Sequence, residues 1–249
     1  MKKGVILVDF DNVFYGREFN AGVIRNQLDD FIQAALAANA EIESLTIRLY
    51  GGWKTHAEYT AEASKVLGCI ETVNSHLFPY IYDRRVIQGE VSLATSQYNL
   101  DIEWENTLQE KSTRHRLNVR PDTVHRCHHS PDECPIHLVA RATRGQRVTC
   151  PIDGCEMIDV SQLVRLEQKM VDSMMNCDIL EYILDKDSEV QVLEVVSDDI
   201  DFHPALALAG ERYAQANGVK LLLVVGNRQN REHYEHLLGA HHIQISTWQ

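Results

Sequence analysis

The sequence predicts an α/β protein with a mainly parallel sheet flanked by helices, a PIN-like or Rossmann-like arrangement that carries an inserted zinc-binding segment. Residues 4–11 form a continuous apolar run that ends in acids, a pattern typical of a strand buried on both faces. The last sixty or so residues alternate regularly between strand and helix patterns, as βαβ units do. A length of 249 residues favours one large domain or one domain with an insert.

Along the N-terminal half, the expected elements follow from hydrophobic spacing. Apolar residues recur at helical intervals over 22–39, and the next apolar run ends at the pair Gly51 and Gly52. The elements predicted here are a strand at 4–11, a helix at 22–39, a strand at 45–50, a helix at 57–67 and a strand at 86–93.

In the C-terminal half, helical spacing resumes at Leu163, Leu166, Met170 and Met174. The remaining predicted elements are a strand at 190–196, a helix at 204–217, a strand at 219–225, a helix at 229–238 and a strand at 243–247. Periodicity fails between these halves. We therefore predict an α/β domain in two parts, 1–110 and 160–249, interrupted by an insert at 111–159.

Acidic clusters follow two of the predicted strands. Asp9, Asp11 and Asn12 end the first strand, and Asp198, Asp199 and Asp201 follow the strand at 190–196. Because the carboxyl ends of parallel strands meet at one edge of a sheet, we expect both clusters to line the same crevice.

A third acidic position lies on the predicted helix between these strands. Lys169, Asp172 and Asn176 fall on one polar stripe of that helix. Converging carboxylates repel one another unless a cation neutralises them, and Mg²⁺ and Mn²⁺ prefer oxygen ligands. The structural alternative is that these acids are helix caps, and Asp198 is well placed to cap the following helix.

Three blocks of the sequence together resemble the signature of the NYN domain, a family of PIN-like nucleases. The blocks are Val8-Asp9-Phe10-Asp11-Asn12, then Lys169-x-x-Asp172-x5-Asp178, then Ser197-Asp198-Asp199-Ile200-Asp201-Phe202. The resemblance covers about residues 1–70 and 160–249. The chain departs from the family at Asp198, where glycine is usual, and at Ile200, where the family has a small residue.

The resemblance implies a metal-dependent nuclease, a ribonuclease before a deoxyribonuclease. Asp9, Asp172, Asp199 and Asp201 would bind Mg²⁺ or Mn²⁺, and Asn12 would orient a ligand or water. The cation would activate water for phosphodiester hydrolysis. Asp178 lies about 240° round an ideal helix from Asp172, so we expect it to act from the edge of the site or structurally.

Two other classes of function remain open. The first block also resembles the motif of haloacid dehalogenase-like phosphatases, in which Asp9 would be the nucleophile and Asp11 the acid or base. A catalytically silent nucleic-acid-binding module is the second alternative. Intact acids in all three blocks argue against loss of activity, and the second and third blocks fit the NYN pattern better than the phosphatase pattern.

The insert contains two cysteine pairs with spacing suited to metal binding. In a cytosolic protein, clustered cysteines indicate zinc more often than a disulfide. The predicted structural Zn²⁺ ligands are Cys127, Cys134, Cys150 and Cys155, and His128, His129 or His137 could replace one of them. The alternative is a set of unliganded thiols in a loop.

The insert is also basic within an acidic chain. Its residues 111–147 hold eight basic and three acidic side chains, whereas the whole chain has a formal net charge of −12. We expect Arg141, Arg144 and Arg147, together with Lys169, to contact nucleic acid phosphates, with RNA as the partner before DNA. If these residues form only a solvated surface, a protein partner or a homodimer contact becomes the expected role.

The longest wholly apolar run, 221–225, is much shorter than the roughly 20 residues of a membrane span. The apolar stretch after Lys2 and Lys3 stops at Asp9, without the pattern of a secretory signal. The sequence therefore predicts a cytoplasmic protein without a membrane partner.

Overall fold

The computed structural model describes residues 1–14, 20–100, 102–112, 164–185, 189–226 and 228–248. The chain divides into two compact units. The first comprises Met1–Thr107 and Met170–Gln249, and the second comprises Leu108–Lys169. No helix in these described ranges is long and apolar enough to cross a membrane.

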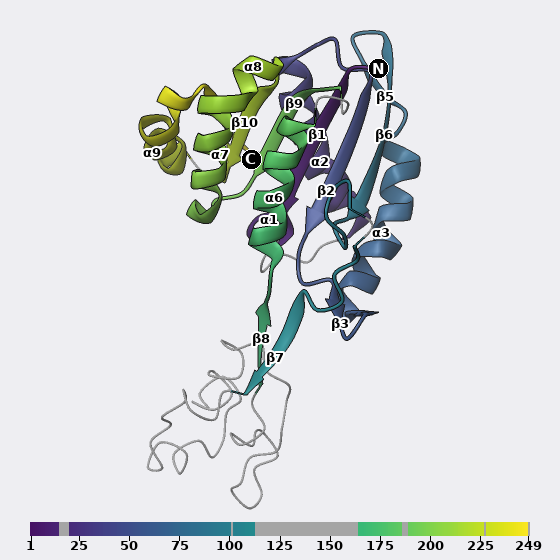
Figure 1. Ribbon diagram of the computed structural model, residues 1–249. Coiled ribbons are helices and arrows are strands. Elements are labelled where there is room, and N and C mark those ends of the chain that lie inside the picture. Colours follow the sequence, from purple (N-terminus) through teal and green to yellow (C-terminus); the bar gives the residue numbers. More distant parts are fainter. Residues whose placement is uncertain (15–19, 101, 113–163, 186–188, 227, 249) are drawn as a thin grey trace, which may run out of the picture. The chain divides into compact units, whose positions relative to one another are not determined.

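The first unit is built on a seven-stranded sheet with the order β11-β10-β9-β1-β2-β6-β5 (Figure 1). All neighbouring pairs are parallel except β5 and β6, which form an antiparallel hairpin. The strands are β1 (Lys3–Asp9), β2 (Ser44–Tyr50), β5 (Tyr80–Tyr82), β6 (Arg85–Leu93), β9 (Val190–Val196), β10 (Lys220–Val225) and β11 (Ile243–Thr247).

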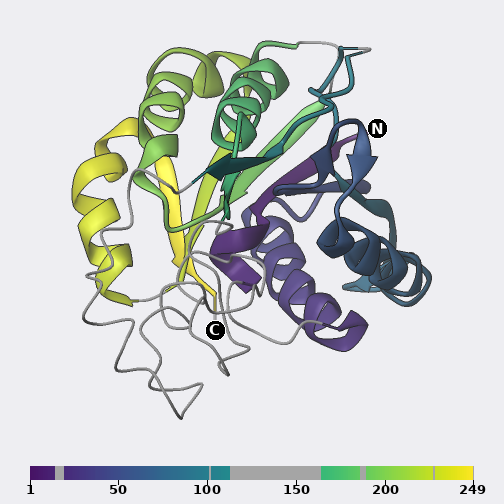
Figure 2. The same cartoon turned by 90° about the horizontal axis from the view of Figure 1, so that it is seen from below.

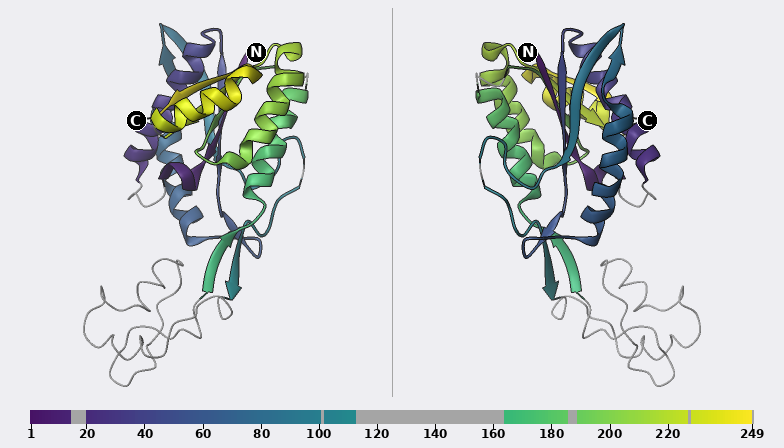
Figure 3. Two further views of the ribbon diagram at one scale, coloured as in Figure 1. Left: turned by 90° about the vertical axis from the view of Figure 1, so that its left-hand side faces the viewer. Right: turned by 90° about the vertical axis from the view of Figure 1, so that its right-hand side faces the viewer.

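Helices cover both faces of this sheet (Figure 3). α1 (Phe10–Phe14), α2 (Ala21–Ala38) and α3 (Ala61–Leu77) pack on one face, and α6 (Val171–Leu184), α7 (His203–Ala209) and α9 (Arg228–Leu238) pack on the other. Along β1, Ile6 and Val8 join the first apolar core while Val5 and Leu7 join the second. Burial on both sides explains the continuous apolar run, and the predicted α/β class with a mainly parallel sheet is confirmed.

Short elements complete the C-terminal half. A 3₁₀ turn η3 (Ile200–Phe202), α7, a π-helical turn η4 (Gly210–Ala214) and α8 (Gln215–Asn217) follow one another directly, so the helix predicted at 204–217 is present with irregular turns. Gly218 ends it at φ 70°, a conformation that glycine adopts without a Cβ penalty. η5 (Gly239–His241) precedes β11.

The helix predicted at 57–67 occupies different residues. Lys54–Thr55 (β3) and Glu58–Tyr59 (β4) form a small antiparallel hairpin, so α3 begins only at Ala61. The Thr60 hydroxyl accepts a hydrogen bond from the Ala63 N–H at 3.1 Å and caps the helix. α3 then continues to Leu77, ten residues beyond the predicted end.

The helix predicted from the spacing of Leu163, Leu166, Met170 and Met174 is wrong over its first half. Val164–Gln168 is a strand, β8, that pairs antiparallel with β7 (Leu108–Ser112) in the second unit. The helix α6 starts at Val171, and Met170 before it is 41% exposed with φ 65°. Backbone pairing with a strand distant in sequence therefore overrides a local helical pattern.

The insert predicted at 111–159 falls almost wholly outside the described residues. Cys127, Cys134, Cys150 and Cys155, the alternative ligands His128, His129 and His137, and Arg141, Arg144 and Arg147 all lie there. Zinc binding and phosphate contact by this segment remain predictions.

One charged residue is buried in the centre of the sheet. Glu194 lies on β9 between Ile6 of β1 and Leu222 of β10, with no exposed surface. Neither of its carboxyl oxygens has a hydrogen-bond partner in the described part of the chain. Burial raises the pKa of Glu194 well above its ordinary value of 4.5, which favours the neutral form of the carboxyl in the folded protein.

We expect Glu194→Leu to stabilise the protein at alkaline pH. The raised pKa means that this group costs least stability below about pH 4.5 and progressively more as the pH rises toward its folded value. Removing an unpartnered buried polar group should add about 1–3 kcal/mol near pH 8. Thermal unfolding from about pH 5 to pH 9 measures the effect. A lower melting temperature for the leucine variant across that range would contradict the assignment.

Candidate functional site

The predicted acids gather at the carboxyl edge of the sheet, at its topological switch point. From β1 the chain builds β2 and β6 on one side, while β9, β10 and β11 lie on the other. Asp9 ends β1, and the segment 197–199 follows β9 directly beside it. Figure 2, the view from below, places the short helix α1 that follows Asp9 near the centre of this edge. Open α/β sheets bind ligands at such points.

Asp9 is held between two segments by hydrogen bonds. The carboxyl is 5% exposed and accepts from the Asn12 side-chain amide at 2.5 Å, from the Asn12 N–H at 3.3 Å and from the Ser197 hydroxyl at 2.9 Å. Ser197 in turn accepts from the Asp199 N–H at 2.9 Å. Asn12 therefore orients Asp9 itself. Ser197 was absent from the predicted site residues, although it directly follows a buried strand.

Asp199 and Asp201 flank the exposed side chain of Ile200 on η3. The Asp201 N–H donates to Asp199 Oδ1 at 2.9 Å, and the Asn176 amide of α6 donates to the Asp201 carbonyl at 3.2 Å. Phe202 anchors the turn in the core, while Ile200 is 62% exposed. The structural alternative, that these acids are helix caps, therefore holds for Asp199, which caps η3 with one of its two carboxyl oxygens.

Asp198, which stands where the NYN domain usually has glycine, connects neighbouring elements of the first unit. Its Oδ1 accepts from the Gly226 N–H at 2.8 Å, and its backbone carbonyl accepts from the Tyr234 hydroxyl at 2.8 Å. These bonds tie the end of β9 to the end of β10 and to α9. A Cβ on Gly226 would lie 2.5 Å from Asp198 Oδ2, so glycine is required for this close approach.

The acids of the three blocks influence one another electrostatically. Burial raises the pKa of Asp9 to about 6, the bonds from Ser197 and Asn12 oppose that rise, and the charge of Asp172 adds to it. Burial, followed by the charges of Asp199 and Asp201, raises the pKa of Asp172. In the described part of the chain none of these four acids forms an ion pair. Within the described residues, the site therefore holds negative charge with no ion pair to a protein cation.

The donor chemistry of this cluster suits an oxygen-liganded cation such as Mg²⁺ or Mn²⁺, which retains several waters. The side chains are not arranged as a closed cage, because no three His, Cys, Asp or Glu residues within the described ranges form a group that could hold a metal ion. The fit therefore rests on charge and ligand type.

Asp178 has the structural environment of a buried ion pair. It is fully buried, accepts from the Tyr50 hydroxyl and from the Tyr98 N–H at 2.9 Å, and lies 3.4 Å from the Arg48 guanidinium. Tyr50 is the register partner of Asp9, so this network joins β2 and α6 on the face that carries the acids. Asp178 thus fixes α6 against the sheet.

Lys169 belongs to the second unit and is not placed relative to the acids.

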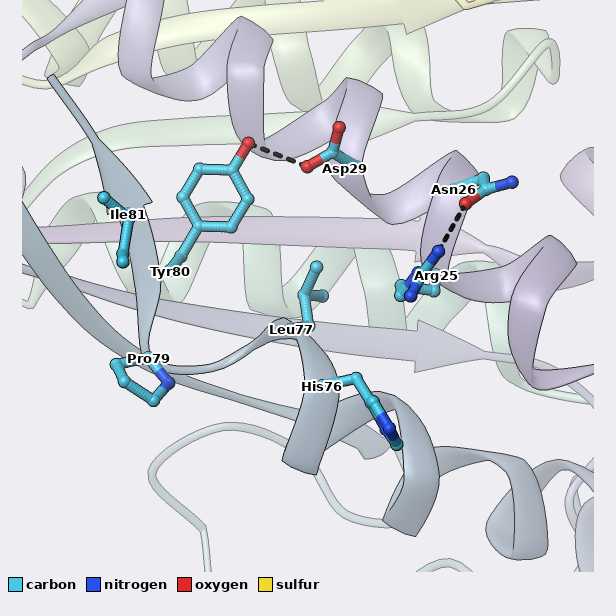
Figure 4. A pocket seen from close by; sticks show the side chains of 8 residues that line it. All are labelled: Arg25, Asn26, Asp29, His76, Leu77, Pro79, Tyr80 and Ile81. Carbon is cyan, nitrogen blue, oxygen red and sulfur yellow. Dashed lines mark hydrogen bonds between the residues drawn. The ribbon is translucent and has the colours of Figure 1, made fainter.

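A separate cavity of about 320 Å³ lies between α2, α3 and β5 (Figure 4). Its lining includes Asp29, which accepts from the Tyr80 hydroxyl at 2.7 Å, and none of the acids of the three blocks. The candidate site is therefore distinct from this cavity.

Comparison of the chain with models of known protein families, with curated proteins and with solved structures finds no match.

We expect Asp9→Asn to flatten the pH dependence of stability in metal-free buffer. The pKa of Asp9 rises from 3.8 to about 6, so ionisation destabilises the folded state as the pH increases through that interval. The shift corresponds to up to about 3 kcal/mol. Chemical denaturation with chelator at about pH 4 and pH 7 measures it. An equal pH slope in the native protein and the variant would contradict the burial of this charge.

Proposed function

We propose that the first unit is a metal-dependent nuclease that hydrolyses phosphodiester bonds, with RNA as the preferred substrate. One observation carries the proposal: acids from three separate segments come near one another at a sheet edge. Besides burial, the charge of Asp172 raises the pKa of Asp9, and the charges of Asp199 and Asp201 raise the pKa of Asp172. Such a cluster needs a cation, and carboxylates with bound Mg²⁺ or Mn²⁺ are suited to phosphoryl chemistry. The same three segments carry the resemblance to the NYN domain.

The residues of the site have distinct roles in this proposal. Asp9, Asp172, Asp199 and Asp201 hold the cation, which when bound activates water and stabilises charge on the phosphate. Asn12 and Ser197 fix the Asp9 carboxyl by hydrogen bonds. Their support restricts the orientation of the Asp9 carboxyl, which would limit the reorganisation needed when a cation binds.

The insert completes the proposal as a recognition module. Its four cysteines, with a histidine as the alternative ligand, hold one structural Zn²⁺, and Arg141, Arg144, Arg147 and Lys169 contact phosphates. Zinc-bound thiolates require a reducing compartment, so a cytoplasmic location is part of the proposal. If the basic residues do not bind nucleic acid, a homodimer contact is the role we assign to them.

We expect Asp199→Asn to lower cleavage of labelled RNA in Mn²⁺ by about 100-fold or more, because a ligand charge is lost while the cap on η3 survives. Glu235→Gln is the matched control, since Glu235 forms only an exposed ion pair with Arg231 on α9. The assay offers single-stranded DNA and a small phosphomonoester in parallel.

The pattern of products separates the classes of function. Turnover of the phosphomonoester alone would indicate the haloacid dehalogenase-like phosphatase. RNA binding without turnover by the native protein would indicate a silent binding module. Full nuclease activity in Asp199→Asn would reject the proposed metal site.

We expect the purified protein to contain about one zinc ion per chain, because four thiolates make a closed structural site. Cys127→Ser or Cys150→Ser should lower the zinc content measured by elemental analysis. Cys69→Ser, at a half-buried thiol on α3, should leave it unchanged. Reactive thiols at all four insert cysteines and no zinc, in protein never exposed to chelator, would contradict the zinc prediction.

A further inference from the structure

The cavity between α2, α3 and β5 combines polar groups of one helix with apolar groups at the end of another helix and on an edge strand (Figure 4). Its volume of about 320 Å³ lies at the lower end of the range of about 300–1,000 Å³ that is typical of small-molecule sites. All of its lining belongs to the first unit. It is therefore a candidate ligand site of the α/β unit itself.

Arg25 on α2 lines this cavity and forms no ion pair with the described residues. Asp29, one turn further along the same helix, is the acid whose spacing suits such a pair. Asp29 instead accepts from the Tyr80 hydroxyl at its Oδ1 and from the Gln33 amide at its Oδ2, each at 2.7 Å. Because neutral donors hold this carboxylate, the Arg25 guanidinium remains available to an anion from outside.

Asn26, the next residue of α2, adds hydrogen-bond donors to the same wall. Its Oδ1 accepts a long hydrogen bond from the Arg25 guanidinium at 3.4 Å. With the oxygen turned toward Arg25, the amide nitrogen keeps both of its protons for another acceptor. A guanidinium beside an amide nitrogen offers several N–H donors, which suit the oxygens of a carboxylate or a phosphate. The polar wall of the cavity therefore fits an oxyanion.

The rest of the lining is largely apolar. Leu77 at the end of α3, Pro79 and Ile81 contribute to it, and Figure 4 places Pro79 and Ile81 across the cavity from Arg25. At 73% exposed, Ile81 is the most exposed large apolar side chain among the described residues. A ligand that covers it gains free energy by removing apolar surface from water. The cavity thus suits a ligand with an apolar part as well as a charge.

We propose that this cavity binds a small organic anion with an apolar body. The anionic group lies against the Arg25 guanidinium and the Asn26 amide, and the body lies against the apolar wall at Ile81. A carboxylate and a phosphate monoester share this chemistry, since both present oxygens to N–H donors. The inference goes beyond the proposed nuclease and does not depend on it, because none of the acids of the three blocks lines the cavity.

The test is titration of the full chain in metal-free buffer near neutral pH, followed by protein NMR chemical shifts. Phenyl phosphate and benzoate share an apolar ring and differ in the anionic group, whereas inorganic phosphate lacks the ring and phenol lacks the charge. We expect at least one of the two organic anions to bind about 10-fold more tightly than both inorganic phosphate and phenol. The tighter of the two identifies the anionic group that the cavity prefers.

Three variants locate the binding. Arg25→Gln should weaken binding of the tighter organic anion by about 10-fold or more, because a charge-assisted hydrogen bond is lost. Arg84→Gln is the matched control, since it removes the same charge from an exposed arginine on the turn between β5 and β6, outside the cavity lining. Ile81→Ser should weaken binding of the organic anion and leave that of inorganic phosphate unchanged.

Weaker binding in Arg25→Gln together with native affinity in Arg84→Gln supports the inference. An equal loss in both arginine variants would show only general attraction of anions and overturns it. Native affinity in Arg25→Gln overturns it as well, and so does the failure of both organic anions to bind at millimolar concentration. In each of these cases the proposed nuclease stands, because the probes and the variants leave the acids of the three blocks unchanged.

Discussion

The parallel pairing of β1 with β9 is the interaction on which the candidate site depends. These strands are neighbours in the sheet although 188 residues separate Asp9 from Ser197, whose hydroxyl donates to the Asp9 carboxyl. The pairing is stabilised by apolar residues that are buried on both faces, and it delivers two acidic segments to one edge. Hydrophobic burial therefore provides the free energy that holds like charges together, since those charges contribute only repulsion until a cation is bound.

Three buried carboxyl groups show how differently the fold treats negative charge. Asp178 accepts hydrogen bonds from the Tyr50 hydroxyl and the Tyr98 N–H and pairs with Arg48, so its negative charge is neutralised and its side chain is held in place. Glu194 receives no donor from the described residues, and burial raises its pKa so that the neutral form is favoured. Asp9 lies between these cases, with donors enough to fix its geometry, while burial and, to a smaller extent, the charge of Asp172 raise its pKa to about 6. Only the third arrangement leaves charge available to a ligand, and this contrast distinguishes the site from structural acids on the same sheet.

Elements whose pattern reflects burial in the sheet were predictable from the sequence. The strands at 190–196 and 243–247 have the predicted ends, because each apolar run coincides with a buried strand. The failure at 163–170 arose because Leu166 lies on a strand whose partner, Leu108–Ser112, is distant in sequence. Ser197 was missed as a site residue for a related reason. Its importance lies in a single hydrogen bond to Asp9, which folding brings near and which no periodicity records.

The distribution of charge along the chain constrains how such an enzyme can meet its substrate. Residues 111–147 carry a formal charge of +5, which leaves −17 on the rest of the chain. A polyanion is therefore repelled once it comes within about 8–10 Å of the α/β unit, the distance beyond which salt largely screens the repulsion. Attraction has to come from the basic insert or from divalent cations at the acidic edge. Because the two sources differ in kind, the proposed nuclease would bind nucleic acid and hydrolyse a small phosphodiester with different residues. Recognition and chemistry are then separable properties of one chain.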